Sequence, residues 1–309
     1  MGYAVLFPGQ GSQAVGMGAD VFAARPDLLG EAADEILGWP LAATCAGGPE
    51  EELTHTDRAQ PALFAVSYAL WEAFRDAVAE SPQAAAGHSL GEYTALAAAG
   101  ALGFGDGLRL VAARGMAMAA AAGREPSGMA ALLGAGVGEA EALAAACRER
   151  GGRLWVANLN APGQVVVAGG SDDITWAAEH GRDHGVRRVI PLKVAGAFHS
   201  PFMAPAAHDL TEAVSSTPMR EPAFPVWANA TGLPHTTDIG RGLLEQLTSP
   251  VLFERSLVAM AEAGITRFVH IGPGEVTAGL AGRSIEGCET HVVSTLKEAA
   301  VVAGAIGAG

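Results

Sequence analysis

Gly87-His88-Ser89-Leu90-Gly91 is the stretch of this sequence that indicates a fold class most directly. It follows a short run of small residues typical of a buried strand, and it precedes an alanine- and leucine-rich stretch, residues 92–99, typical of a helix. A G-x-S-x-G sequence between a strand and a helix indicates a nucleophile elbow, whereas a glycine turn with an ordinary exposed serine would not need this context. The two glycines allow the sharp turn, because a Cβ there would clash with neighbouring backbone. Ser89 is therefore predicted to be a nucleophile at a helix N-terminus, where backbone N–H groups stabilise developing negative charge.

The composition limits the classes of protein to which the chain can belong. Its 309 residues, 50% of them hydrophobic, suffice for one domain with an insertion or for two domains. The net charge of −14 argues against general nucleic-acid binding. The 3 cysteines form no CxxC or Cys/His cluster, so we expect no structural zinc or disulfide framework, and a reducing cytoplasm suits them. We also expect no signal peptide and no membrane span, since no apolar run reaches about 18 residues.

Two polar residues near the N-terminus are further candidates for the site. Gln10 lies in a glycine loop that follows the apolar run 3–7, and this loop lacks the spacing and the lysine of a phosphate-binding P-loop. Such a loop can bring a backbone N–H close to a reacting carbonyl, although a plain turn fits equally well. Gln60 stands at the start of a predicted helix, where Pro61 suits the first turn.

Arg114 is predicted to be buried, because it lies beside Gly115 among the apolar turns of a predicted helix over residues 106–118. A buried guanidinium needs an anionic partner, and its planar fork fits a carboxylate bidentately. Periodicity alone leaves open whether that partner is an internal salt bridge or a ligand.

The middle of the chain predicts a separate small subdomain. Its elements run strand, helix, strand, strand, helix, strand, which is the ferredoxin-like split motif. We expect this inserted subdomain over residues 126–196, and an α/β-hydrolase-like large subdomain with a parallel sheet over residues 1–125 and 197–309. The alanine- and glycine-rich tail, residues 301–309, is expected to fray.

Nine histidines could in principle serve Ser89 as a base. His88 is adjacent to Ser89, so its side chain is expected to point elsewhere. His199 lies at a loop–helix junction just beyond the predicted insertion, where the chain returns to the large subdomain. A structural histidine among apolar neighbours is the alternative for His199.

Seven separated motifs resemble, in one collinear order over essentially the whole chain, the malonyl-CoA:acyl-carrier-protein acyltransferases of fatty-acid synthesis and of polyketide synthases. The motifs are residues 7–13 (FPGQGSQ), 60–63 (QPAL), 87–93 (GHSLGEY), 114–115 (RG), 158–166 (NLNAPGQVV), 197–200 (AFHS) and 271–274 (IGPG).

The resemblance implies the principal roles at the site. Ser89 looks like the acyl-accepting nucleophile and His199 like its general base, with no acidic third member. The backbone N–H groups of Gln10 and Leu90 resemble an oxyanion hole. Arg114 looks like the clamp for the free carboxylate of malonate.

The resemblance also implies substrate-binding and supporting residues. Gln60, Met118 and Phe198 match substrate-binding positions, and the aromatic Phe198 before the histidine resembles a polyketide-type signature that leaves little room for an α-methyl branch. Gln246 matches the position whose backbone carbonyl orients the histidine, and Asn229 matches a nearby supporting position.

The implied reaction is ping-pong transfer of a malonyl group from malonyl-CoA, through a malonyl-serine, to the phosphopantetheine thiol of an acyl carrier protein. It needs no metal and no cofactor, and it involves no nucleic acid and no membrane. We expect a discrete polyketide acyltransferase, with fatty-acid synthesis as the other pathway. The alternatives are an acyl hydrolase, a transferase of another acyl group between carriers, and a non-catalytic carrier-binding module. Carrier docking is expected to use basic residues of the small subdomain, namely Arg148, Arg150, Arg153, Arg187 and Arg188.

Overall fold

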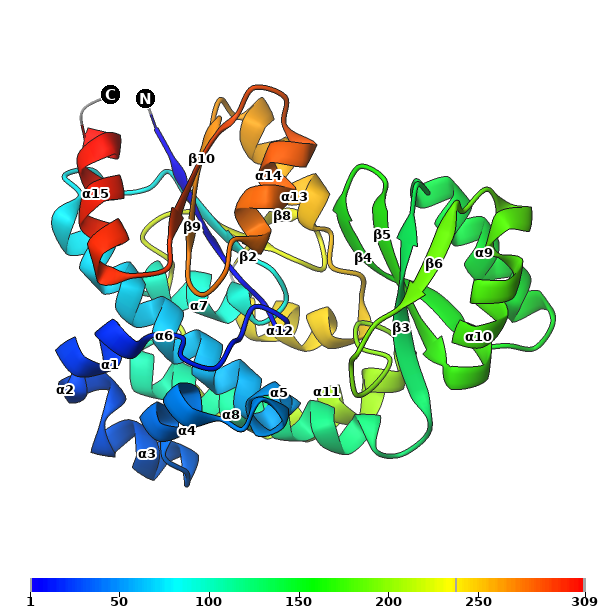
Figure 1. Cartoon of the computed structure of the whole chain (residues 1–309), viewed down its shortest axis with the longest axis horizontal. Coiled ribbons are helices and arrows are strands. Elements are labelled where there is room, and N and C mark those ends of the chain that lie inside the picture. Colours follow the sequence, from blue (N-terminus) through cyan, green and yellow to red (C-terminus); the bar gives the residue numbers. More distant parts are fainter. Residues whose placement is uncertain (1, 237, 308–309) are drawn as a thin grey trace.

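The computed structural model describes residues 2–236 and 238–307, and it contains two sheets that lie toward opposite ends of the molecule in Figure 1. The larger sheet has six strands, and all its neighbouring strands are parallel except the short edge pair β7 and β8. The predicted α/β fold with a parallel sheet is confirmed. The strand order is β10 (Glu289–Val293), β9 (Arg267–Ile271), β1 (Ala4–Phe7), β2 (Ala84–Gly87), β7 (Val226–Ala228) and β8 (Leu233–Pro234).

Helices cover both faces of this sheet. Because both faces are buried, the central strand β1 is continuously apolar instead of alternating between apolar and polar residues. Val5 and Phe7 pack into one core cluster, whereas Ala4 and Leu6 pack into a second cluster on the other face. The helices outside the smaller sheet are α1 (Ala19–Ala24), α2 (Pro26–Leu29), α3 (Glu31–Leu37), α4 (Leu41–Gly47), α5 (Glu50–Thr54), α6 (Thr56–Ala77), α7 (Gly91–Ala98), α8 (Phe104–Ala122), α11 (Ala204–Ser216), α12 (Ile239–Thr248), α13 (Phe253–Glu262), α14 (Val276–Ser284) and α15 (Leu296–Gly307), with a 3₁₀ turn at Pro201–Met203.

The smaller sheet is antiparallel, with strand order β4-β5-β3-β6, and two helices pack on it to form a third core cluster. This order and the βαββαβ succession are those of the ferredoxin-like split motif. Its elements, drawn in green in Figure 1, are β3 (Ser127–Leu133), α9 (Val137–Glu149), β4 (Leu154–Ala161), β5 (Gln164–Gly170), α10 (Ser171–His180), a 3₁₀ turn at Gly181–His184 and β6 (Arg188–Pro191). The division of the chain at residues 126–196 stays a prediction.

The predicted fraying of the tail is wrong for residues 301–307, which belong to α15; residues 308–309 lie outside the described part of the chain. Ala299, Val302, Ala303 and Ile306 are buried, and their spacing places them on one stripe of a helix that packs against α6. No helix within residues 2–236 and 238–307 is long and apolar enough to cross a membrane.

Candidate active site

Ser89 lies in the tight turn between β2 and α7, at the carboxyl end of the parallel sheet. Its φ of 52° is in the left-handed region, which non-glycine residues rarely adopt and which is common at functional turns. A Cβ on Gly87 would overlap the backbone of Gly91, and a Cβ on Gly91 would overlap the carbonyl of Phe7. Both glycines of the motif are therefore required by the close approach of α7 to β1 and β2.

His199 lies next to Ser89, although 110 residues separate them in the sequence, and its Nε2 is 2.7 Å from the Ser89 Oγ. On the other side of the ring, Nδ1 lies 2.9 Å from the backbone carbonyl of Gln246, which can only accept a hydrogen bond. The Nδ1 proton therefore donates to Gln246, and Nε2 is left to accept the hydroxyl proton of Ser89. Burial and the nearby charge of Arg114 lower the pKa of His199 to about 3, so the ring is neutral at physiological pH.

Arg114, on α8, is buried beside the same hydroxyl. Its guanidinium donates to Gln60 Oε1 at 2.6 Å, to Gln246 Oε1 at 2.8 Å and to Ser89 Oγ at 3.1 Å. Within the described ranges, no carboxylate forms an ion pair with it. Burial lowers the pKa of Arg114, as expected for a cation removed from water, although the nearby charge of Glu92 opposes this shift. The internal salt bridge that the sequence left open is therefore not formed.

Asn229, which follows β7, hydrogen-bonds to the backbone of the turn that contains Ser89. Its Oδ1 accepts the backbone N–H of Ser89 at 2.6 Å, and its Nδ2 donates to the carbonyl of Gly87 at 2.7 Å. Because both contacts are to backbone atoms of the turn, Asn229 stabilises the unusual conformation of Ser89 without touching its side chain.

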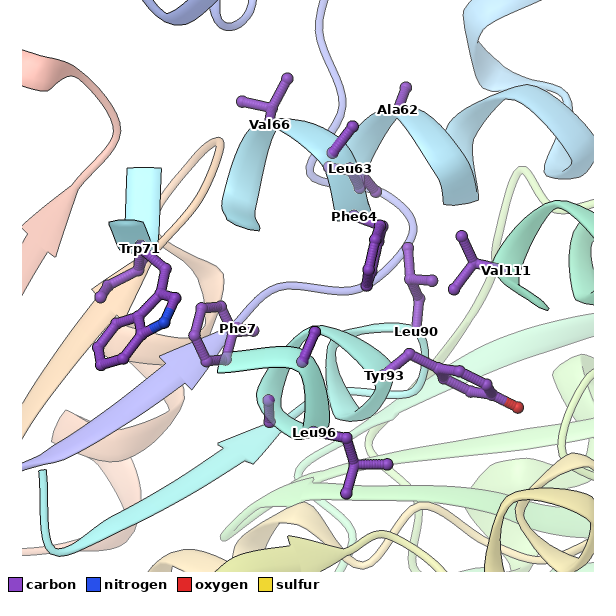
Figure 2. Close-up of a cluster of buried hydrophobic side chains, with 14 of the residues drawn as sticks. Phe7, Ala62, Leu63, Phe64, Val66, Trp71, Leu90, Tyr93, Leu96 and Val111 are labelled. Carbon is purple, nitrogen blue, oxygen red and sulfur yellow. The ribbon is translucent and has the colours of Figure 1, made fainter. Parts of the chain in front are cut away.

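The two backbone donors implied for an oxyanion hole lie on adjacent loops. Figure 2 shows the Leu90 side chain pointing toward Phe64 of α6 and Val111 of α8, so that it anchors the residue after Ser89 in the core. Gln10 is held through its side chain, whose Nε2 donates to Thr56 Oγ1 at 3.2 Å. In the part of the chain that the structure describes, neither the Gln10 nor the Leu90 backbone N–H donates a hydrogen bond.

A cavity of about 310 Å³ opens onto Ser89, Arg114 and His199. Three residues implied to bind substrate also line it, namely Gln60, Met118 and Phe198. The smaller sheet contributes a further part of the wall, with Met129, Asn158, Asn160, Gln164, Val166 and the segment 192–194 that follows β6, and the loop after β1 contributes residues 9–13. The site thus lies between the two sheets.

The sequence analysis assigns no role to two residues of the elbow, His88 and Glu92. His88 lines the cavity, and its Nε2 lies 2.7 Å from Asn160 Oδ1 on β4, so the elbow also contacts the smaller sheet. Glu92 is fully buried one turn after Ser89, and its Oε1 accepts from His235 Nε2 at 2.7 Å. The sequence does signal Glu92, since a glutamate inside an apolar helix needs a buried partner. Nothing local identifies His235 as that partner.

Metal-ligating side chains do not gather anywhere within residues 2–236 and 238–307 in a group of three or more. The site consists of a serine, a neutral histidine, a charged arginine and backbone donors. Such a set can activate a hydroxyl, stabilise an oxyanion and bind a carboxylate.

The chain is similar to known acyltransferases. The model of the acyl transferase domain matches residues 5–303. The malonyl CoA-acyl carrier protein transacylase of Bacillus subtilis strain 168 is 40% identical over 295 residues, which are 94% of this chain and 93% of that protein. The polyketide biosynthesis protein ThaF of Burkholderia thailandensis is 43% identical over 279 residues, which are 90% of this chain but 24% of that longer protein.

Among solved structures, PlMCAT:AntF, a type II PKS acyl-carrier protein in complex with its malonyl-transacylase, matches with a TM-score of 0.91 and 34% identity, covering 98% of this chain and 99% of that chain. The match to the family model spans all seven sequence motifs, so the predicted resemblance is confirmed. The chain belongs to the acyl transferase domain family.

Proposed function

We propose that the chain transfers a malonyl group from malonyl-CoA to the phosphopantetheine thiol of an acyl carrier protein, with a malonyl ester on Ser89 as the intermediate. The observation that carries the proposal is the buried guanidinium of Arg114, which lies 3.1 Å from the Ser89 Oγ and forms no ion pair within the described residues. A small acyl group with a free carboxylate at its far end reaches from the serine to such a cation. The named transacylase relatives support the same substrate.

In the first half-reaction, His199 removes the Ser89 proton while the serine oxygen attacks the thioester carbonyl of malonyl-CoA. The backbone N–H groups of Gln10 and Leu90 stabilise the oxyanion of the tetrahedral intermediate. The C–S bond then breaks, and coenzyme A leaves as a thiol with the proton that His199 returns. Arg114 holds the malonyl carboxylate throughout.

In the second half-reaction, the thiol of the carrier's phosphopantetheine arm gives its proton to His199 and attacks the malonyl ester. The ester bond breaks, and His199 returns the proton to Ser89. No external acid or base is consumed, and no metal or cofactor takes part. Because one product leaves before the second substrate reacts, we expect ping-pong kinetics. Gln246 and Asn229 support the histidine and the elbow.

Phe198 supports the choice of an unbranched malonyl unit, because its ring lies in the cavity wall directly before His199 in the sequence. Because an aromatic residue directly before the histidine resembles the polyketide-type signature, the proposal includes the supply of extender units to a polyketide synthase. So is a reducing compartment such as the cytoplasm, since Cys45, Cys147 and Cys288 all carry free thiols.

The test is the intact-protein mass after mixing with malonyl-CoA or acetyl-CoA, for the wild type, Ser89→Ala and Arg114→Ala. We expect a malonyl adduct on the wild type, none on Ser89→Ala, and little acetyl adduct on the wild type. Loss of the Arg114 guanidinium should abolish the preference for malonyl-CoA. Free coenzyme A and malonate without an adduct would indicate a hydrolase instead, and equal labelling by both thioesters would contradict the role of Arg114.

A further inference from the structure

We propose that Glu92 is a positioning residue for acyl transfer, which acts by fixing the side-chain amide of Gln246. The inference rests on the proposed function for its substrate, but its geometry is independent of that substrate. Glu92 touches neither Ser89 Oγ, His199 nor Arg114 by a hydrogen bond, so it is not itself a catalytic residue.

Glu92 is a fully buried carboxylate with three donors around it. Its Oε2 accepts the Gln246 Nε2 at 2.6 Å and the Asn229 backbone N–H at 2.9 Å, and its Oε1 accepts the His235 Nε2 at 2.7 Å. Two N–H donors on one oxygen are what an ionised carboxylate accepts. A buried charge with this many partners fixes the groups that it holds.

The amide of Gln246 has one orientation in this environment. Its NH₂ group faces two acceptors, the Glu92 carboxylate and the Ser89 backbone carbonyl at 2.9 Å. Its Oε1 consequently faces Arg114, whose guanidinium can only donate. A flipped amide would place an oxygen against two oxygens and an NH₂ against a cation.

Gln246 contacts all three reacting groups, one through its backbone carbonyl and two through its side-chain amide. Its backbone carbonyl holds the His199 ring, its NH₂ holds the Ser89 carbonyl, and its Oε1 holds the Arg114 guanidinium. Through the side-chain amide, Glu92 thus positions the nucleophile and the carboxylate clamp, next to the backbone carbonyl that holds the base, and this explains why a charge is buried in α7.

The experiment is a double-mutant cycle with Glu92→Gln, Gln246→Met and the double variant, measured as the rate of Ser89 acylation by malonyl-CoA and by acetyl-CoA. Glu92→Gln keeps the size but removes the charge, and we expect the malonylation rate to fall about ten- to hundredfold. The preference for malonyl-CoA over acetyl-CoA should fall with it, which a general loosening of the fold would not cause. In the Gln246→Met background, Glu92→Gln should lower the malonylation rate by less than about threefold.

A matched control is His235→Gln, which keeps an N–H donor for the other carboxylate oxygen and should retain most of the rate. Effects of Glu92→Gln and Gln246→Met that multiply in full would overturn the proposal, as would a folded His235→Gln that loses as much rate as Glu92→Gln. Should Glu92→Gln not fold, Gln246→Met alone decides, because a folded Gln246→Met with the wild-type rate and preference contradicts the proposal.

The same cycle with a fluorophosphonate, which labels an activated serine without a malonyl group, separates this proposal from the proposed function. If malonyl-CoA forms no adduct on the wild type, the proposed function fails. Coupled losses in fluorophosphonate labelling would still support the role of Glu92, and independent losses would overturn it.

Discussion

A neutral side chain, His199, and a positively charged one, Arg114, both contact the hydroxyl of Ser89. His199 is neutral, and it is kept neutral partly by the adjacent charge of Arg114. A carboxylate bound to Arg114 would offset that charge, so binding of an anionic acyl group would make His199 a stronger base at the moment it is needed. Substrate choice and activation of the nucleophile are thereby connected through one guanidinium.

The neutral state of His199 predicts an unusual pH dependence. Since its pKa is lowered to about 3, the imidazole keeps its basic nitrogen free of a proton down to that pH. Rapid-quench measurement of Ser89 malonylation at malonyl-CoA concentrations well below saturation, which reports the free enzyme, should therefore give a rate that changes less than about twofold between pH 8 and pH 5.5. A decline centred near the ordinary histidine value of about 6.5 would contradict the environment described for this residue.

Gln60→Glu should weaken malonyl selection, because its carboxylate would form an ion pair with the Arg114 NH1 that now donates to Gln60 Oε1 at 2.6 Å. We expect the ratio of malonyl to acetyl labelling to fall at least about tenfold. Gln164→Glu is the matched control, because it adds the same charge to the cavity wall but contacts Arg283. Equal losses in both variants would show that general charge, and not pairing with Arg114, is responsible.

The sequence predicts residues of the site when their signal is local. Ser89 is identified by a motif that specifies its own turn, and Arg114 is identified as a charged residue among apolar residues at helical spacing. The contact between Glu92 and His235 spans 143 positions, and the one between Glu92 and Gln246 spans 154. No period or turn pattern encodes such pairs, so they become visible only when the fold has brought β8, α7 and α12 together.

At the level of elements, the predictions succeed for strands with long apolar runs and fail where composition misleads. The abundance of alanine and glycine in α15 suggests fraying, yet a stripe of four small or aliphatic residues is enough to dock the helix on α6. The short helices α1 to α5 are punctuated by glycine and proline and have four to seven residues each, which is too little for a clear period.

The close packing of α7 against β1 predicts that Gly91→Ala destabilises the protein. The added Cβ would meet the Phe7 carbonyl, which cannot move because it accepts the His88 N–H at 3.0 Å. We expect a loss of about 1–3 kcal/mol in the free energy of unfolding, measured by denaturant titration. Gly282→Ala, in an exposed part of α14 with open space around its Cβ, should be neutral or stabilising, and similar losses in the two variants would contradict the packing argument.

On the scale of the whole molecule, the cavity between the sheets determines where a carrier protein must approach. The segment after β6 lines the cavity, so the C-terminal end of β6 lies beside it, whereas Arg188 stands at the N-terminal end of the strand. The five arginines predicted for docking differ in availability. Arg150 pairs with Asp173 and stacks on Trp176, Arg153 pairs with Glu125 and stacks on Phe202, and Arg148 donates to a backbone carbonyl.

Arg187 and Arg188 are exposed and form no ion pair within residues 2–236 and 238–307. Of the five arginines, these two are therefore the best candidates to bind an acidic carrier. Reversing both charges to glutamate should slow transfer from malonyl-Ser89 to an acidic carrier by about tenfold, with a smaller effect at high salt. The acylation of Ser89 by malonyl-CoA should be unchanged, because neither arginine lines the cavity. The matched control reverses two exposed arginines outside the smaller sheet that also form no ion pair within the described residues, Arg220 and Arg255. If the control slowed transfer as much, net charge and not a docking site on β6 would account for carrier recognition, since the chain already carries a net charge of −14.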